Sequence, residues 1–305
     1  MGEGVIEVNA LTKDYGSGRG VFDVSFSVNR GEVFGFLGPN GAGKTTTIRH
    51  IMGFSRPQSG ATSVYGKDSF AYHSDIMKDL GYLPGEIALP EGLSGWDFIR
   101  MMQKLKNCTD EGRLKYLLEK FELDPSGSLK RMSIGVKRKL AVVTAFMHDD
   151  DVLILDEPTS GLDPIMQETF IEFVKEEKAR GKTILLSSHI FSEIDATCDR
   201  IAIIKNGKIM SVFVADDIRY NQNKTFRITF ADAADYAKFM TYGFRIVHAE
   251  EQNRTIKFAV NDADVNALIR DVAALSVTDF TEEKFTLEDY FMRFYYEEKE
   301  FGGVR

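Results

Sequence analysis

The chain has 305 residues, of which 43% are hydrophobic and 28% charged, and its net charge is −8. This length leaves room for two domains of ordinary globular composition, and the acidic balance argues against binding to nucleic acid. The sequence has no run near the ~20 apolar residues of a membrane helix and no signal-peptide pattern at its start, so we expect a cytoplasmic protein that reaches a membrane only through a partner.

The first part of the chain is rich in predicted strands. Apolar and polar residues alternate over 5–8 and 21–28, as in half-buried strands, and the apolar run 33–37 predicts a buried strand. A glycine-rich loop then leads into a helix that we expect from about Lys44 to Gly53. The alternating strands predict an antiparallel β layer added to the strand–loop–helix unit.

The middle of the chain, 92–147, has mostly helical patterns and predicts a helical subdomain. Alternation of strands and helices then returns, with strands at 152–156 and 183–188, helices at 165–180 and 190–198, and a hairpin at 200–213. The hairpin turn is Asn206-Gly207, a favoured two-residue turn. This order predicts an α/β fold with a mainly parallel sheet and helices on both faces.

The pattern changes after the polar segment near Tyr220. Strand and helix patterns follow in the order β-α-β-β-α-β, which is the ferredoxin-like order, and a last helix is expected at 286–300. We therefore predict two domains, 1–219 and a small α+β domain at 220–305 with an accessory, regulatory or dimerisation role.

A phosphate-binding loop is the strongest motif. The stretch "GPNGAGKTT" follows a buried strand and opens a helix, as phosphate binding requires. Its backbone N–H groups are expected to surround phosphate, while Lys44 supplies a cation and Thr45 a hydroxyl for Mg²⁺. The nucleotide-binding residues predicted here are Gly38, Pro39, Asn40, Gly41, Ala42, Gly43, Lys44, Thr45 and Thr46.

Two acidic residues end the next buried strand. Four apolar residues precede Asp156 and Glu157, and an acid at the end of a strand buried on both faces is costly unless it meets a cation. Asp156 therefore suits Mg²⁺, and Glu157 is placed to orient and deprotonate a water molecule. His189 follows the strand at 183–188, so its side chain is expected at the same carboxyl edge of the sheet.

These motifs, in this order, resemble those of the ATP-binding subunits of ABC transporters over about residues 5–214. Within that resemblance, Tyr15 matches the aromatic residue that stacks on adenine, and Asp163 in "SGLD" matches the loop that crosses the dimer interface. His189 matches the switch histidine that contacts the γ-phosphate. The resemblance implies a P-loop NTPase of ABC type, with ATP and Mg²⁺ as ligands and ATP hydrolysis as the activity.

The family's signature, Leu-Ser-Gly-Gly-Gln, is represented by "MSIGV" at 132–136. Ser133 and Gly135 keep a hydroxyl donor and a close backbone approach at a helix N-terminus, which are what a phosphate needs. Ser133 is equally a plain helix N-cap, and the two roles are compatible. The following "KRK" is either basic charge near the anion site or a solvated helix face.

A second departure from the family lies at Gly85, where relatives usually have a glutamine that ligates Mg²⁺ and contacts the membrane partner. The next residue, Glu86, is a candidate to supply an oxygen to Mg²⁺ instead. The alternative is that Gly85 only shapes a turn and water fills the site.

The resemblance implies a chain that dimerises around two Mg·ATP, with itself or with a related subunit, and docks on an integral membrane permease at the inner face of the membrane. The C-terminal domain and "GYLPGE" resemble bacterial multidrug, bacitracin or lantibiotic exporters. The alternative is a soluble ABC-type ATPase that acts on the ribosome or DNA. Such relatives usually carry two ATPase domains or a long coiled-coil insertion, and this sequence has neither.

Overall fold

The computed structural model describes residues 4–219, 223–284, 286–292 and 294. The chain divides into two compact units, Met1–Ala215 and Asp216–Arg305. The short helix α8 (Asp216–Arg219) falls in the second unit, whereas the sequence placed the boundary after residue 219. Among the described residues, no helix is long and apolar enough to cross a membrane.

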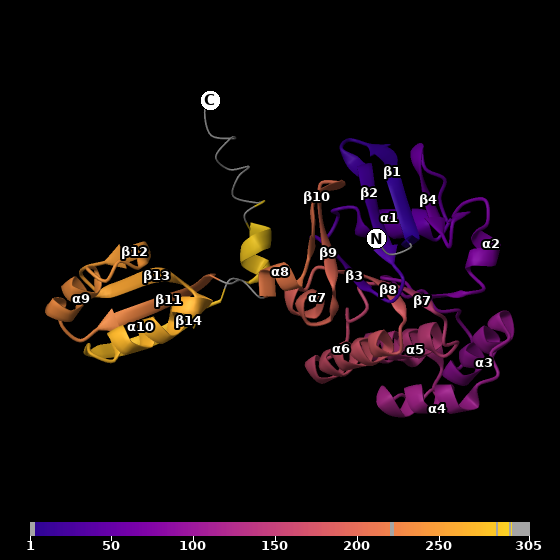
Figure 1. The fold of residues 1–305 in the computed structure, drawn as a ribbon. Helices are drawn as coiled ribbons and strands as arrows, with labels where there is room; N and C mark the ends of the chain where they lie inside the picture. Colours follow the sequence, from indigo (N-terminus) through magenta and orange to yellow (C-terminus); the bar gives the residue numbers. More distant parts are fainter. Residues whose placement is uncertain (1–3, 220–222, 285, 293, 295–305) are drawn as a thin grey trace. The chain divides into compact units, whose positions relative to one another are not determined.

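The first unit contains two sheets (Figure 1). One is the antiparallel layer, in the order β2-β1-β4-β5, and the other has six strands in the order β10-β9-β3-β8-β7-β6. The strands of the first sheet are β1 (Gly4–Gly16), β2 (Arg19–Asn29), β4 (Ser59–Val64) and β5 (Lys67–Asp68). Those of the second are β3 (Val33–Leu37), β6 (Leu80–Leu83), β7 (Val152–Asp156), β8 (Thr183–Ser188), β9 (Arg200–Lys205) and β10 (Lys208–Val214).

The centre of the six-stranded sheet is parallel. Strands β9, β3, β8, β7 and β6 run parallel, and the hairpin partner β10 pairs antiparallel with β9 at one edge. Every residue of β3, β7 and β8 is buried, as expected for strands covered on both faces. Because parallel strands end at the same edge, the loops that follow β3, β6, β7 and β8 gather there.

Helices cover both faces of this sheet, as predicted. Helix α1 (Lys44–Ile51) lies between the two sheets, and α5 (Ile134–Phe146) and α7 (Phe191–Thr197) pack against the other face, with α6 (Pro164–Ala179) beside α7 (Figure 1). One core joins the antiparallel sheet, α1 and the parallel sheet, and the stacked rings of Phe26 and Phe34, 5.1 Å apart, link the layers.

The helical subdomain is built from α3 (Gly95–Lys106), α4 (Glu111–Lys120), the 3₁₀ turn η1 (Leu129–Arg131) and α5. The sequence specifies where these helices begin. Ser94 and Asp97 form a reciprocal capping box at α3, and Asp110 accepts a hydrogen bond from the Arg113 backbone at the start of α4. A short helix, α2 (His73–Ile76), precedes β6 and was not predicted.

The second unit has the predicted ferredoxin-like topology, with the antiparallel order β12-β13-β11-β14. Its elements are β11 (Asn223–Phe230), α9 (Ala233–Phe239), β12 (Arg245–Glu250), β13 (Thr255–Asn261), the 3₁₀ turn η2 (Asp262–Asp264), α10 (Val265–Val272) and β14 (Val277–Glu283). Phe239 and Leu268 pack both helices on one face of the sheet. Residues 287–292 are helical, and part of the helix predicted at 286–300 lies outside the described residues.

Candidate active site

The phosphate loop connects β3 to α1. Gly43, the residue before α1, has φ of 113°, a backbone conformation that residues other than glycine rarely adopt. A Cβ at Gly38 would lie 2.4 Å from the Ile204 carbonyl oxygen, so only glycine fits there. Lys44 is buried and donates hydrogen bonds to the carbonyls of Gly38 (2.6 Å) and Pro39 (3.2 Å). The loop is therefore preformed around its lysine.

The predicted hairpin turn supports this loop. The Gly207 N–H donates to the Ala42 carbonyl at 2.9 Å, and the Phe22 N–H donates to the Gly207 carbonyl at 2.7 Å. The turn thus joins the phosphate loop to strand β2 of the antiparallel sheet. Tyr15, near the end of β1, is 58% exposed with Lys13 Nζ 5.8 Å from its ring centroid, and its stacking on a base stays a prediction.

Asp156 ends β7 and is fully buried. Its carboxylate accepts hydrogen bonds from the Thr45 hydroxyl at 2.7 Å and the Ser187 hydroxyl at 2.5 Å. Burial raises the pKa of Asp156, while the Ser187 and Thr45 hydroxyls lower it. A hydroxyl and a carboxylate side by side are the oxygen donors that Mg²⁺ prefers, so Thr45 and Asp156 fit a Mg²⁺ site.

Glu157 lies at the meeting point of three elements. One carboxylate oxygen forms an ion pair with Lys44 Nζ at 2.9 Å, without the angles of a hydrogen bond. The other is 2.7 Å from His189 Nδ1. The backbone at Glu157 has φ of 48°, and its N–H donates to the Ser187 carbonyl at 3.0 Å. The structure thus brings together the predicted Lys44, Glu157 and His189.

Helix α5 begins at "MSIGV". Ser133 is its N-cap, and the Ser133 hydroxyl accepts from the Val136 N–H at 3.3 Å. Ile134, which replaces a glycine of the family signature, is 76% exposed. A Cβ at Gly135 would lie 3.1 Å from the Gly161 carbonyl oxygen, so this position has little space for a side chain. Ser133 thus has the predicted capping role, and its phosphate role remains a prediction.

Asp163, in the "SGLD" loop, caps α6. Its carboxylate accepts from the Met166 N–H at 3.1 Å, and Pro164 occupies the first position of the helix. Asp163 is exposed, which leaves it accessible to a second subunit.

At Gly85, a Cβ would lie 3.1 Å from Asp156 Oδ2. The backbone of this residue therefore closely approaches the predicted Mg²⁺ ligand. Glu86 is exposed and forms no hydrogen bond or ion pair with the residues that the structure describes. Its assignment as a Mg²⁺ ligand stays a prediction.

Three residues near the site were not predicted from sequence. The Ser187 hydroxyl donates a hydrogen bond to Asp156. Glu193 accepts a hydrogen bond from the Ser188 hydroxyl at 2.5 Å. Arg138 of "KRK" is buried and donates hydrogen bonds to backbone carbonyls. The solvated-face prediction for "KRK" is wrong for Arg138, which is 4% exposed, and the prediction of basic charge near the anion site stays a prediction. The only sequence signal for Glu193 is its place four residues after His189 at the start of a helix.

Glu193 is a buried acid in the first turn of α7, four residues after His189. Burial raises its pKa to about 7, with the Glu157 charge adding to the rise and the Ser188 hydroxyl opposing it. The Thr159 hydroxyl also lowers the pKa, although Oε1 of Glu193 lacks a partner in hydrogen-bond geometry among the described residues. At neutral pH a large fraction of Glu193 is therefore protonated.

We expect Glu193→Gln to change the pH dependence of stability. The folded protein holds the Glu193 proton more tightly than the unfolded chain, whose pKa is 4.5, so wild-type stability falls as pH rises from 4.5 to about 7. The variant has no such proton to lose. Its free energy of unfolding minus that of wild type should therefore be larger at pH 8 than at pH 4.5, by about 3 kcal/mol at most. Denaturant unfolding of both proteins at several pH values measures the difference. Glu168→Gln, at an exposed site on α6, is the control, and a pH-independent difference for Glu193→Gln would contradict the expectation.

Taken together, a phosphate loop, a strand-end Asp-Glu pair and a histidine at one edge of a parallel sheet define a P-loop ATPase. A family model described as ABC transporter matches residues 21–160. Bacitracin transport ATP-binding protein BcrA of Bacillus licheniformis is 30% identical over 296 residues, covering 95% of this chain and 96% of that protein. The chain belongs to the ATP-binding subunits of ABC transporters.

Two other comparisons agree with this membership. The probable multidrug ABC transporter ATP-binding protein YbhF of Escherichia coli (strain K12) is 34% identical over 223 residues, which cover 72% of this chain and 38% of that protein. The solved structure of an ATP-binding subunit of an ABC transporter is 35% identical, with a TM-score of 0.65, and the match covers 70% of this chain and 92% of the other. The chain is thus an ABC-type ATPase, and subunits of this family dimerise and work with membrane permeases.

Proposed function

We propose that this chain powers a membrane exporter by closing as a dimer around two Mg·ATP. The observation that carries the proposal is the convergence of Lys44, Asp156, Glu157 and His189 at one sheet edge. We propose export as the direction of transport, supported by relatives whose names refer to bacitracin transport, multidrug transport and Nod factor export. A drug, an antimicrobial peptide or a similar compound is the proposed cargo.

Thr45 and Asp156 are the proposed Mg²⁺ ligands. Bound Mg²⁺ supplies positive charge that neutralises the phosphates. The amides of the phosphate loop bind the phosphate oxygens, and Lys44 exchanges its ion pair with Glu157 for the β- and γ-phosphates. This exchange frees one Glu157 oxygen to accept a proton from a water molecule. His189, already in contact with the other oxygen, orients Glu157 and contacts the γ-phosphate.

The signature of each subunit is proposed to complete the site of the other. Ser133 and Gly135 lie at the start of α5, where Ile134 is exposed, and Asp163 is exposed at the start of α6. A phosphate at this helix N-terminus gains the helix dipole and the Ser133 hydroxyl. The partner is a second copy of this chain or a related ATP-binding subunit.

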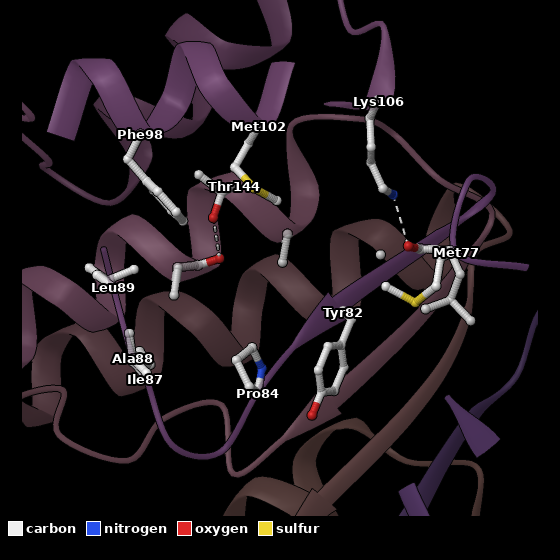
Figure 2. Close-up of a pocket in the computed structure, with 14 residues that line it drawn as sticks. Met77, Tyr82, Pro84, Ile87, Ala88, Leu89, Phe98, Met102, Lys106 and Thr144 are labelled. Carbon is white, nitrogen blue, oxygen red and sulfur yellow. Dashed lines mark hydrogen bonds between the residues drawn. The ribbon is translucent and has the colours of Figure 1, made fainter. Parts of the chain in front are cut away.

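An apolar groove is the proposed docking site for the permease. The groove has a volume of about 220 Å³ and lies between the segment after β6 and helices α3 and α5. Figure 2 shows Phe98 and Met102 of α3 on one side and Ile87, Ala88 and Leu89 on the other. Pro84, next to Gly85, also lines it, so a segment of the permease in this groove would touch the edge that carries the nucleotide site.

Capture from membranes tests this function. The tagged chain should bring down an integral membrane protein from solubilised cells, and that protein should stimulate ATP hydrolysis. Met102→Asp, in the groove wall, should lose the partner and retain ATP binding because it places a charge against apolar side chains. Leu105→Asp, on the same helix but 70% exposed, is the matched control. Recovery with ribosomes in place of a membrane protein would reject the exporter.

A further inference from the structure

Arg138 is a buried cation whose hydrogen bonds to the described residues all go to backbone carbonyls. It lies on α5 and is 4% exposed. Its guanidinium donates from Nε to the Ser160 carbonyl at 2.8 Å, from Nη1 to Pro84 at 2.9 Å and from Nη2 to Gly85 at 2.6 Å. Within the described part of the chain it forms no ion pair. The three carbonyls therefore hold the guanidinium in place.

The three carbonyls belong to two loops that flank the nucleotide site. Pro84 and Gly85 follow β6, and Gly85 packs closely on Asp156. Ser160 lies in the turn after β7, where its N–H donates to the Glu157 carbonyl at 3.1 Å. Arg138 therefore reaches the immediate surroundings of both Asp156 and Glu157 without touching either side chain.

The first turn of α5 rests on the same loop. A Cβ at Gly161 would lie 2.9 Å from Ile134 Cγ2, and a Cβ at Gly135 would lie 3.1 Å from the Gly161 carbonyl oxygen. The signature and the turn that carries Glu157 are thus in direct contact within one chain. A displacement of α5 would move Ser160, Pro84 and Gly85 through Arg138.

We propose that Arg138 is a positioning residue that transmits engagement of the signature to Glu157 of the same subunit and to the loop at Gly85. Arg138 acts in this proposal through the carbonyls that it binds. Gly85 has no side chain to offer the neighbouring Asp156, and Arg138 holds its backbone carbonyl. The inference rests on the proposed function, because it assumes a signature that engages the ATP of a second subunit.

The fork of the guanidinium is essential to this role. Arginine has five N–H donors in a fixed plane, and here they reach three carbonyls at once. Lysine keeps the charge but cannot reproduce this planar fork. Arg138→Lys therefore separates geometry from charge.

The experiment compares wild type, Arg138→Lys and Arg113→Lys in the full chain. Arg113 is the matched control, since it is also a largely buried arginine of the helical subdomain and pairs with Glu177 at 2.8 Å, away from the site. Binding of a fluorescent ATP analogue, the maximal rate of ATP hydrolysis and the ATP-dependent dimer fraction are measured for each. Arg138→Lys should bind nucleotide as wild type does and hydrolyse it about 10- to 100-fold more slowly, because Glu157 is misplaced.

A second readout separates positioning from loss of folding. With Glu157 intact, slow hydrolysis in Arg138→Lys should cause the ATP-bound dimer to accumulate, which a merely destabilised protein would not do. Wild-type turnover in Arg138→Lys, or a parallel loss of binding and turnover matching that in Arg113→Lys, would overturn the positioning role alone. Absence of ATP hydrolysis and dimerisation in the wild type would overturn the proposed function and this inference together.

Discussion

Glu157→Gln is expected to reduce steady-state ATP hydrolysis by about 100-fold or more, the usual contribution of a general base. Glutamine keeps the shape and the contact to His189 but cannot accept the proton of the attacking water. Lys44 loses its ion pair and keeps its hydrogen bonds to Gly38 and Pro39, so the phosphate loop should still bind ATP. The variant should therefore accumulate as an ATP-bound dimer, measured by size-exclusion chromatography with and without ATP.

The matched control for this prediction is Glu168→Gln, which removes a carboxylate from an exposed position of α6. It should leave turnover and the monomer–dimer distribution unchanged. Full hydrolysis by Glu157→Gln would reject Glu157 as the base and would direct attention to another acceptor. A variant that no longer binds ATP would instead show that Glu157 holds the phosphate loop open for nucleotide.

Ser133→Ala is expected to lower maximal turnover by about tenfold or more while leaving the ATP affinity of a single chain unchanged. A hydrogen bond from a hydroxyl to a charged phosphate contributes about 1.5–3 kcal/mol, and this bond would form only in the closed dimer. The rate should be measured at saturating ATP, and affinity under conditions where the chain stays monomeric. The two measurements separate a role in the closed dimer from a role in first binding.

Loss of the helix cap is the competing explanation, because Ser133 also caps α5. Ser94→Ala is the control: it removes the N-cap of α3 in the same subdomain, where the capping box is complete, and costs a similar ~1 kcal/mol of stability. If both variants lose turnover equally, the effect is structural and the signature interpretation fails. If only Ser133→Ala is slow, the hydroxyl acts on phosphate.

Much of the fold could be predicted from local sequence patterns of strands and turns. The buried strands at 33–37 and 152–156 lack polar side chains up to the phosphate loop and up to Asp156, and the strand at 183–188 has the apolar run 184–186, as strands covered on both faces require. The Asn206-Gly207 turn was also readable, since turn residues are a local property. By contrast, α2 spans four residues and has too few positions to show a helical period.

The site was predictable where backbone chemistry determines residue type. The residue types of the phosphate loop and of the strand end could be predicted, as at Gly38, Gly43 and the Asp156–Glu157 pair. The roles of three other residues depend on contacts between distant segments: Ser187, Glu193 and Arg138. Arg138 lies 54 residues from Pro84 and 22 from Ser160, so no spacing rule connects them. A basic triplet on a helix is ordinarily solvated, and only the packing of α5 against two loops buries its middle member.

The left-handed backbone conformation at Glu157 affects how substitutions at this position change the stability of the protein. A φ of 48° costs a glutamate of order 1 kcal/mol, and asparagine or glycine adopt it more easily. The most relaxed residue at this position is thus one that removes the proposed base. A substitution at this position that relaxes the backbone would therefore give a more stable chain that lacks the proposed base.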